Sequence, residues 1–185
     1  MDMVKVGPAK AQGYCGNFWD EKGRGELAQL FVACDGIGVS SLQFLFYENS
    51  TLVLSDKHGS DDCNKFNAIV LDYPSEFLTS ISGQFVSGQF VNGQSGLMTR
   101  FSYLKTISFY TNKGSYGPFG STATDGSDFF NFEIGNYRSF CGFHGTAHGY
   151  GIGSIGVYMK PITTSMIHFR NPLVKVESEE DQEEV

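Results

Sequence analysis

A glycine-rich run near the C-terminal end of the chain, Gly149-Tyr150-Gly151-Ile152-Gly153, has the composition of a ligand-binding loop. Glycine lets the backbone approach a bound molecule closely, so that main-chain N–H groups can act as donors. The overlapping segment Gly151–Gly156 matches G-x-G-x-x-G, a pattern that binds phosphate groups where a strand leads into a helix. Here the following residues, Ser154–Tyr158, read as a strand, and too little chain remains for a strand–helix–strand unit. A nucleotide site is therefore not predicted.

Histidines are the next candidates for chemistry, and two of them, His58 and His144, stand beside glycines. A catalytic histidine needs a nucleophile and an orienting carboxylate, and the chain contains no G-x-S-x-G nucleophile motif. Asp56 lies two residues from His58, a spacing that suits a turn. We expect both histidines to be structural, and we predict that the protein is not an enzyme.

Cysteine usage argues against a metal site and in favour of a reducing compartment. Cys15, Cys34, Cys63 and Cys141 form no C-x-x-C pair and have no neighbouring histidine pair, which a zinc site would need. The N-terminal residues lack the basic and apolar segments of a signal peptide, and no apolar run reaches the ~18–20 residues that span a membrane. We therefore expect a cytoplasmic protein with reduced thiols, no cofactor and no membrane association.

The net charge of −7 is concentrated at the C-terminus. Removing the six acidic residues of that end leaves a body with a charge of only −1, without a Lys/Arg stripe that could neutralise phosphates. Nucleic acid is therefore not a predicted partner. We expect the acidic end to be a solvated, disordered tail, and docking of a basic partner is the alternative. The six residues are Glu177, Glu179, Glu180, Asp181, Glu183 and Glu184.

Apolar and polar residues alternate along most of the chain, and no sustained helical period occurs. In Ser41–Tyr47, for example, Leu42, Phe44 and Phe46 would share one face of a strand. About ten to twelve short strands separated by Gly, Asn, Asp and Ser clusters are typical of an all-β sandwich, barrel or prism. Further strands are predicted at Leu27–Cys34, Thr51–Ser55, Phe66–Leu71, Phe77–Ser82, Leu104–Thr111, Phe130–Ile134, Phe140–Gly145 and Ile155–Met159.

The length of 185 residues and the 41% of hydrophobic residues are sufficient for one domain with its own core. Pro161 ends the last clear strand, so we place the domain at residues 1–161 and a C-terminal extension at 162–185. Two aromatic segments within the domain leave alternatives open. Tyr116–Gly120 is interpreted as a rigid turn with inward rings, with a stacking platform as the alternative. The loop from Gln84 to Gly96 either forms a wall of a binding site or merely connects strands.

A faint internal repeat is also present. A hydroxyl residue, a branched aliphatic residue, any residue, and then Phe or Val occur in this order at Ser41–Phe44, Thr106–Phe109 and Ser154–Val157. Gly-Ile-Gly precedes the first and third copies, at Gly36–Gly38 and Gly151–Gly153. If the repeat is structural and not a chance match, it predicts three similar β units around a common core.

An ordered series of segments between Val4 and Pro161 resembles the jacalin-related lectins of plants. The resemblance implies a β-prism of three four-stranded antiparallel sheets with pseudo-threefold symmetry. It also implies sugar binding without bond breaking, a preference for mannose or glucose, and a nucleocytoplasmic location. The segments are Val6-Gly7-Pro8, Gly16–Asp20, Tyr73–Gly83, Thr111-Asn112-Lys113, Tyr116–Gly120, Gly142–Gly145 and Ile155–Tyr158.

In that family one sugar lies between an N-terminal glycine-rich loop and a G-x-x-x-D loop before the last strand. The resemblance places the first loop at Gly16 and the second at Gly149–Gly153, with Tyr150 shaping the rim. Two departures weaken this assignment: the Asp position is Gly153, and the usual glycine doublet reads Cys15-Gly16. Loss of a charged acceptor costs about 1.5–3 kcal/mol, or roughly ten- to a hundredfold in affinity.

The sequence therefore predicts a recognition protein for mannose/glucose-class glycans or glycoproteins, with a role in plant defence. The alternative is a protein–protein interaction module, for example in antiviral or stress resistance, with a degenerate sugar site. The missing carboxylate and the acidic tail both suit that alternative. Self-association into a homo-oligomer is left open by the sequence.

Overall fold

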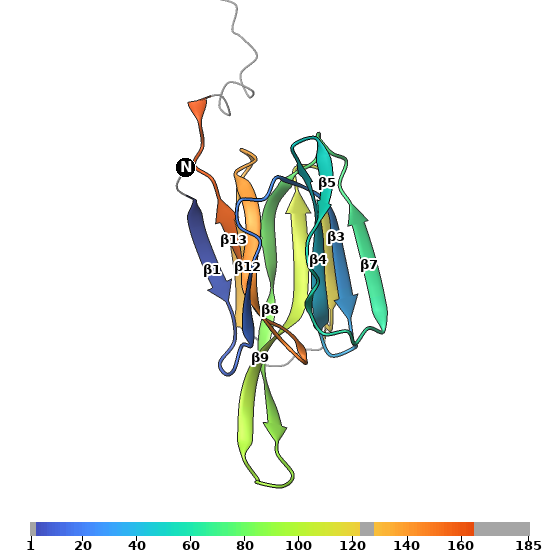
Figure 1. Cartoon of the computed structure of the whole chain (residues 1–185), viewed down its shortest axis with the longest axis vertical. Helices are drawn as coiled ribbons and strands as arrows, with labels where there is room; N and C mark the ends of the chain where they lie inside the picture. Colours follow the sequence, from blue (N-terminus) through green and yellow to red (C-terminus); the bar gives the residue numbers. More distant parts are fainter. Residues whose placement is uncertain (1–2, 123–127, 165–185) are drawn as a thin grey trace, which may run out of the picture.

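The computed structural model describes residues 3–122 and 128–164, which form three antiparallel sheets (Figure 1). The predicted prism of three four-stranded sheets is confirmed, with one additional two-residue strand. Sheet A has the order β1 (Val4–Ala9), β13 (Gly151–Met159), β12 (Phe140–His148) and β2 (Asn17–Asp20). Sheet B has the order β10 (Ser115–Gly120), β9 (Met98–Thr111), β8 (Leu78–Val91) and β11 (Asp128–Glu133). Sheet C has the order β5 (Thr51–Leu54), β4 (Val39–Glu48), β3 (Glu26–Cys34) and β7 (Lys65–Val70), and β6 (His58–Gly59) also pairs with β4.

The internal repeat corresponds to the threefold arrangement of the fold. Its three copies fall on β4, β9 and β13, one inner strand from each sheet, and these strands contact one another in the centre of the molecule. The apolar positions of the repeat are fully buried there because alternate side chains of each strand point toward the axis. They are Leu42 and Phe44, Ile107 and Phe109, and Ile155 and Val157.

The strands differ from the sequence-based prediction in three places. Strands β1 and β2 have no strong alternation of their own and were not predicted. Tyr116–Gly120 belongs to strand β10 instead of a turn, although the Tyr116 and Phe119 rings do pack against the core as expected. Most of the loop predicted at 84–96 extends the β8–β9 hairpin, because these residues pair with partners in β9 that periodicity does not reveal. This hairpin projects beyond the sheets at the lower end of Figure 1.

His58 and His144 are buried and structural, as predicted. His58 Nε2 donates to Glu21 Oε1 at 2.8 Å, and the ring stacks on Trp19 with a centroid distance of 4.2 Å. Arg24 pairs with the other Glu21 oxygen at 2.6 Å. These contacts join the end of β2 in sheet A to β6 in sheet C. His144, from β12, is fully buried, and its Nε2 donates to the Val6 carbonyl at 3.0 Å.

The C-terminal extension is described only as far as residue 164. The predicted disordered tail, with all six acidic residues, lies outside the described residues. Among the residues that are described, no helix has the length and apolar character needed to cross a membrane.

Burial of His144 predicts a loss of stability in mild acid. Burial lowers the pKa of the His144 imidazole below its usual value of 6.5, so the unfolded chain binds this proton more tightly than the folded protein. The stability contributed by the neutral ring is complete above that usual value and decreases as the pH falls below it. We expect the melting temperature to fall between about pH 7.5 and pH 5.5, and to fall less in His144→Gln, whose amide can still donate to Val6. Equal falls in the two proteins would contradict this assignment.

Candidate functional site

The two glycine loops predicted to form a site meet at the end of the prism from which the β8–β9 hairpin projects, at the bottom of Figure 1. We call it the apical end. A Cβ atom built on Gly16 would lie 2.1 Å from the Ala147 carbonyl oxygen, at the end of β12. A Cβ atom built on Gly153 would lie 1.8 Å from the Cys15 carbonyl oxygen. Both glycines therefore allow backbone contacts that no other residue would permit, and these contacts hold the two loops together.

The predicted residues differ in their access to a ligand. Gly149 and Tyr150 are exposed, Gly16 is half-buried, and 54% of the Tyr150 surface is accessible. Gly151 and Gly153 are buried, and the Ile152 side chain belongs to the hydrophobic core. Gly151 has a φ of +133°, and a Cβ there would lie 2.9 Å from the Val39 carbonyl oxygen, so its role is to pack β13 against β4.

Main chain occupies the space in which a side chain of residue 153 would begin. The Cys15 carbonyl packs directly against the Cα of Gly153, where an Asp side chain would begin. The three segments that meet here (10–16, 84–104 and 147–153) contain no Asp or Glu, so they supply no charged acceptor for a sugar hydroxyl. A ligand hydroxyl that donates a hydrogen bond at the apical end would have to find its acceptor among backbone carbonyls and neutral side chains, because the charged residues of these segments, Lys10 and Arg100, are donors only.

One buried serine connects all three segments. Ser102 Oγ accepts a hydrogen bond from the Ala11 N–H and donates to the Gly153 carbonyl, both at 2.8 Å. The Ser102 N–H donates to the Tyr14 carbonyl at 2.9 Å, and the Ser102 carbonyl accepts from His148 Nε2 at 2.7 Å. Sequence reasoning missed Ser102 because it belongs to no motif, and only the hairpin β8–β9 brings it between the loops.

The orientation of Tyr150 depends on His148. Because His148 Nε2 donates to Ser102, its Nδ1 is an acceptor, and it receives the Tyr150 N–H at 3.2 Å. Both ring nitrogens are thus used inside the protein. His148 positions the turn that carries Tyr150 and is not available as a general base.

Aromatic rings from all three segments gather at the apical end. The Phe101 and Tyr150 rings stack with a centroid distance of 5.0 Å, Tyr14 lies 6.1 Å from His148, and Phe90 lies 6.4 Å from Tyr150. Tyr14, Phe90 and Tyr150 are exposed by 57%, 48% and 54%. We call these five residues the apical aromatic cluster. Partly exposed rings of this kind offer an apolar face together with a polar hydroxyl edge, a combination that suits the apolar faces and hydroxyls of a sugar.

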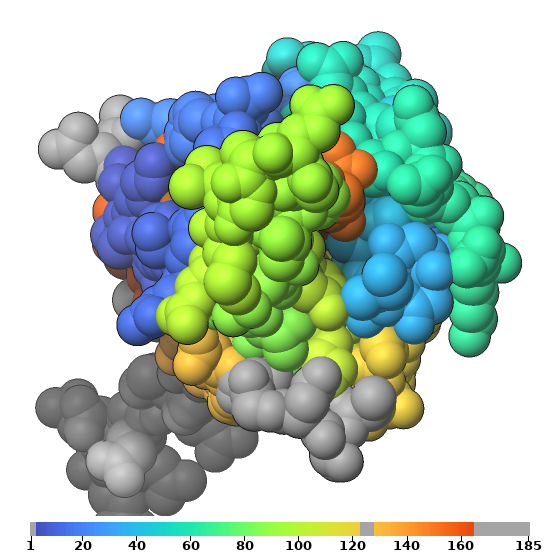
Figure 2. Space-filling model, turned by 90° about the horizontal axis from the view of Figure 1, so that it is seen from below, coloured from blue at the N-terminus to red at the C-terminus, as the bar shows by residue number. Residues whose placement is uncertain are grey.

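Figure 2 looks onto the apical end. The β8–β9 hairpin lies in the centre, with the N-terminal segment (blue) on one side and the turn between β12 and β13 (orange) on the other. Of the cluster, the sequence pointed to Tyr150 and, as part of a loop that could form a wall of a binding site, to Phe90. Tyr14, Phe101 and His148 match no local pattern, and Tyr14 and Phe101 come from distant segments.

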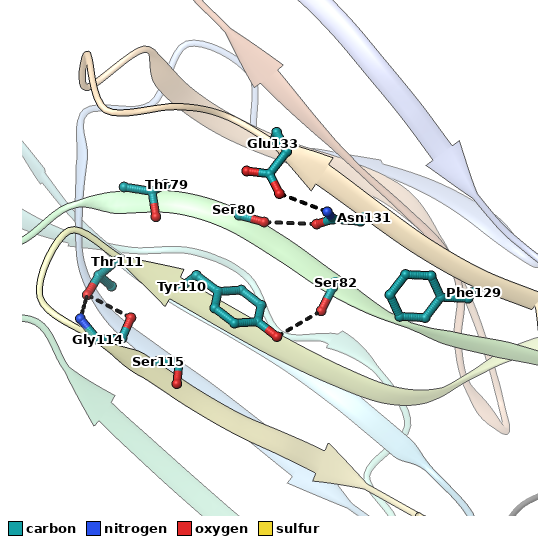
Figure 3. Close-up of a pocket in the computed structure, with 10 residues that line it drawn as sticks. All are labelled: Thr79, Ser80, Ser82, Tyr110, Thr111, Gly114, Ser115, Phe129, Asn131 and Glu133. Carbon is teal, nitrogen blue, oxygen red and sulfur yellow. Dashed lines mark hydrogen bonds between the residues drawn. The ribbon is translucent and has the colours of Figure 1, made fainter.

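A hollow of about 530 Å³ lies on the outer face of sheet B, away from the apical end (Figure 3). Its floor is formed by small hydroxyl residues of β8, including Ser80 and Ser82, and its sides by larger residues of β9 and β11. Ser80 donates to Asn131 at 2.9 Å, Asn131 donates to Glu133 at 2.8 Å, and Ser82 donates to the Tyr110 hydroxyl at 3.4 Å. This sheet B groove can offer hydroxyl, amide and carboxylate groups to a polar ligand, but those groups already bond to one another.

The Cys15 contact predicts that Gly153 cannot be replaced. Gly153→Ala and Gly153→Asp should each lower the free energy of unfolding by about 1–3 kcal/mol, because the Cβ atom forces the Cys15 loop away. Gly149→Ala is the matched control, since a Cβ at Gly149 meets no atom within 4 Å. It should change stability by less than about 0.5 kcal/mol in urea unfolding. A Gly153→Asp protein as stable as the unmodified chain would disprove the contact.

Removal of the Ser102 hydroxyl should loosen the apical end. Ser102→Ala leaves a buried N–H of Ala11 and a buried carbonyl of Gly153 without their partner, at a cost of about 1–3 kcal/mol in unfolding free energy. Ser82→Ala provides the comparison, since its hydroxyl makes one long bond at 3.4 Å on the sheet B surface. Hydrogen exchange should accelerate at Ala11 in the first variant and remain unchanged in the second.

Comparison with known proteins agrees with this geometry. The sequence profile of the Jacalin-like lectin domain matches residues 9–158. The chain is 38% identical over 146 residues to Protein RESTRICTED TEV MOVEMENT 1 of Arabidopsis thaliana, covering 78% of each protein. It is 33% identical over 178 residues to Jacalin-related lectin 2 of the same plant, covering 91% of this chain and 92% of the relative. Among solved structures, the artocarpin–mannotriose complex is similar, with a TM-score of 0.69, 29% identity, and coverage of 87% of this chain and 99% of that chain. The chain therefore belongs to the family of jacalin-like lectin domains.

Proposed function

We propose that the protein is a lectin for mannose- or glucose-class glycans, presented as oligosaccharides or glycoproteins, and that it binds them at the apical end. The observation that carries the proposal is the meeting of the two glycine loops beside exposed rings of the apical aromatic cluster. The similar artocarpin structure contains mannotriose, which supports the same class of sugar for this chain.

Binding at this end would use backbone N–H groups near Gly16 and Gly149 and the rings of Tyr14 and Tyr150. Because the apical segments contain no Asp or Glu, a sugar hydroxyl that donates a hydrogen bond there meets only neutral acceptors, which form weaker hydrogen bonds than a carboxylate does. A single mannose should therefore bind weakly. An oligosaccharide long enough to cover several rings of the cluster should bind more tightly, since each further contact adds binding energy.

We propose recognition without catalysis, in the cytoplasm or shared between cytoplasm and nucleus. At the apical end, His148 already uses both ring nitrogens, and the three segments contain no carboxylate that could serve as a general acid or base. The match to the Jacalin-like lectin domain supports a role in binding without catalysis. Fluorescence imaging of the tagged full chain in plant cells tests the location.

A protein–protein interaction module in plant defence is the second candidate. It is favoured by one specific contact, the closure of the Cys15 carbonyl over Gly153, which leaves no room for a side chain where the resemblance to the lectins places a carboxylate. Similarity to Protein RESTRICTED TEV MOVEMENT 1 adds to this candidate. In such a module the apical aromatic cluster would contact a protein surface in place of a glycan.

Calorimetric titration of mannose and of a high-mannose oligosaccharide into the full chain decides between the two candidates. We expect the oligosaccharide to bind. Tyr150→Ala should lower the affinity for it about two- to tenfold, as expected for loss of one stacked ring. Phe129→Ala is the matched control, because Phe129 is 69% exposed but lies on sheet B.

The other outcomes are equally informative. If Phe129→Ala or Glu133→Gln weakens binding and Tyr150→Ala does not, the glycan occupies the sheet B groove. If neither saccharide produces heat at any accessible concentration, the lectin proposal fails and the interaction module becomes the leading candidate.

A further inference from the structure

The β8–β9 hairpin extends beyond the rest of sheet B at the apical end (Figure 1). Strand β11 pairs with β8 only as far as Phe85, and β10 pairs with β9 only as far as Thr106. Beyond these points the two hairpin strands continue to pair with each other, up to Val91 and Met98. Within the described part of the chain, residues 88–99 form hydrogen bonds only inside the hairpin. Its outer part therefore projects from the sheet as a separate element.

The projecting end carries four exposed apolar side chains. Phe90 is 48% exposed, Val91 53%, Leu97 67% and Met98 61%. Val91 and Met98 are paired across the two strands, and Phe90 and Leu97 are their neighbours in the chain. We call these four residues the hairpin tip. Exposed apolar side chains gathered on one projecting element mark an interaction site, whereas singly scattered ones do not.

The turn that joins the two strands is polar, contains no charged residue and bonds to itself. The Asn92 N–H donates to the Leu97 carbonyl at 3.0 Å, and the Gly96 N–H donates to the Asn92 carbonyl at 2.8 Å. The Asn92 side-chain oxygen accepts from the N–H groups of Gln94 and Ser95 at 2.9 and 3.3 Å. Because these backbone groups already have partners, the turn loses few hydrogen bonds when it leaves water.

The charges closest to the hairpin tip are positive. No charged residue occurs from Gln84 to Thr99, and Arg100 is the first one along β9. Arg100 is exposed and lies two residues behind Met98, on the same face of the strand. Lys10 is a second exposed cation at the apical end, whose three segments contain no Asp or Glu. The hairpin thus places apolar side chains outermost and a cation behind them.

We propose that the hairpin tip inserts into the interfacial region of an anionic lipid bilayer, with Arg100 at the level of the headgroups. Apolar side chains gain free energy when they leave water, and cations are attracted by the anionic lipids of a cytoplasmic leaflet. Tyr14 and Tyr150, which are exposed beside the hairpin, belong to a residue type that is enriched where lipid meets water. A protein partner would need a concave apolar site of matching shape, whereas a bilayer accepts a convex tip without one.

Interfacial insertion is compatible with the absence of a membrane-spanning segment. The expectation of no membrane association rests on the lack of an apolar run long enough to cross a bilayer. An element that enters only the interface needs no such run, since its polar side stays among headgroups and water. The expectation therefore applies to spanning and does not extend to contact through the hairpin tip.

The test is flotation of the full chain with phosphatidylcholine vesicles that contain either no phosphatidylserine or about 30% of it. These lipids carry no sugar, so the outcome is independent of the proposed glycan binding. We expect binding to the anionic vesicles, at least about tenfold weaker binding to the neutral ones, and weaker binding at high salt. Arg100→Gln should lower the partition coefficient on anionic vesicles about fivefold, the effect of one cation near the surface.

A matched pair of leucine variants tests the insertion itself. Leu97→Ser should lower the partition coefficient about tenfold, because it removes an apolar side chain from the inserted tip. Leu52→Ser is the control: Leu52 is 61% exposed but lies on β5 of sheet C, and its variant should bind vesicles like the unmodified chain. Both variants should keep the melting temperature of the unmodified chain within a few degrees, since both side chains are exposed.

Fluorescence gives a direct measure of depth. The unmodified chain has one tryptophan, Trp19, which is buried, so Phe90→Trp adds a reporter at the hairpin tip. With anionic vesicles its emission should shift to shorter wavelength and be quenched by brominated acyl chains, and the emission of Trp19 alone should not. Absence of binding to both kinds of vesicle would overturn the proposal and leave a protein with an apolar groove as the partner of the tip. Equal losses in Leu97→Ser and Leu52→Ser, or vesicle binding without an emission shift in Phe90→Trp, would overturn it as well.

Discussion

Packing of the three inner strands β4, β9 and β13 around one axis is the constraint on which the rest of the structure depends. Each strand contributes two fully buried side chains to this axis, such as Leu42 and Phe44 of β4. No sheet can bury its own inner face alone, so the three sheets stabilise one another. The same packing brings the starts of β4 and β13 next to the middle of β9, which is how the apical end is assembled.

At that end the close packing limits the chemistry that is available. The Cys15 carbonyl lies where a Cβ of residue 153 would be, so only glycine fits at this position. Ser102 bonds to both loops. The contact that stabilises the junction therefore also excludes any side chain, and with it any carboxylate, at position 153. What remains for recognition is backbone and aromatic surface, with Tyr14 and Tyr150 the most exposed rings.

The outer faces of sheets B and C differ in polarity. Sheet B presents hydroxyl, amide and carboxylate groups, whereas the strands of sheet C expose the apolar side chains of Leu52, Leu54, Phe66 and Val70. Since the core needs only the inward side of each strand, the outward side is free to vary without loss of the fold.

Much of this protein could be predicted from local sequence alone. Alternation identified most strands, because a strand with one buried face repeats every two residues, and the motif order led to the prism and the family. The two glycine loops were also correctly expected to meet. Sequence did not reveal Ser102, Phe101 or Tyr14 as parts of the apical end, nor that Ile152 faces the core. These depend on which distant segments become neighbours, and the Cys15–Gly153 contact exists only once β9, β12 and β13 have packed. The local pattern determines which side chains of a strand lie on the same face, and only tertiary packing decides what each face contacts.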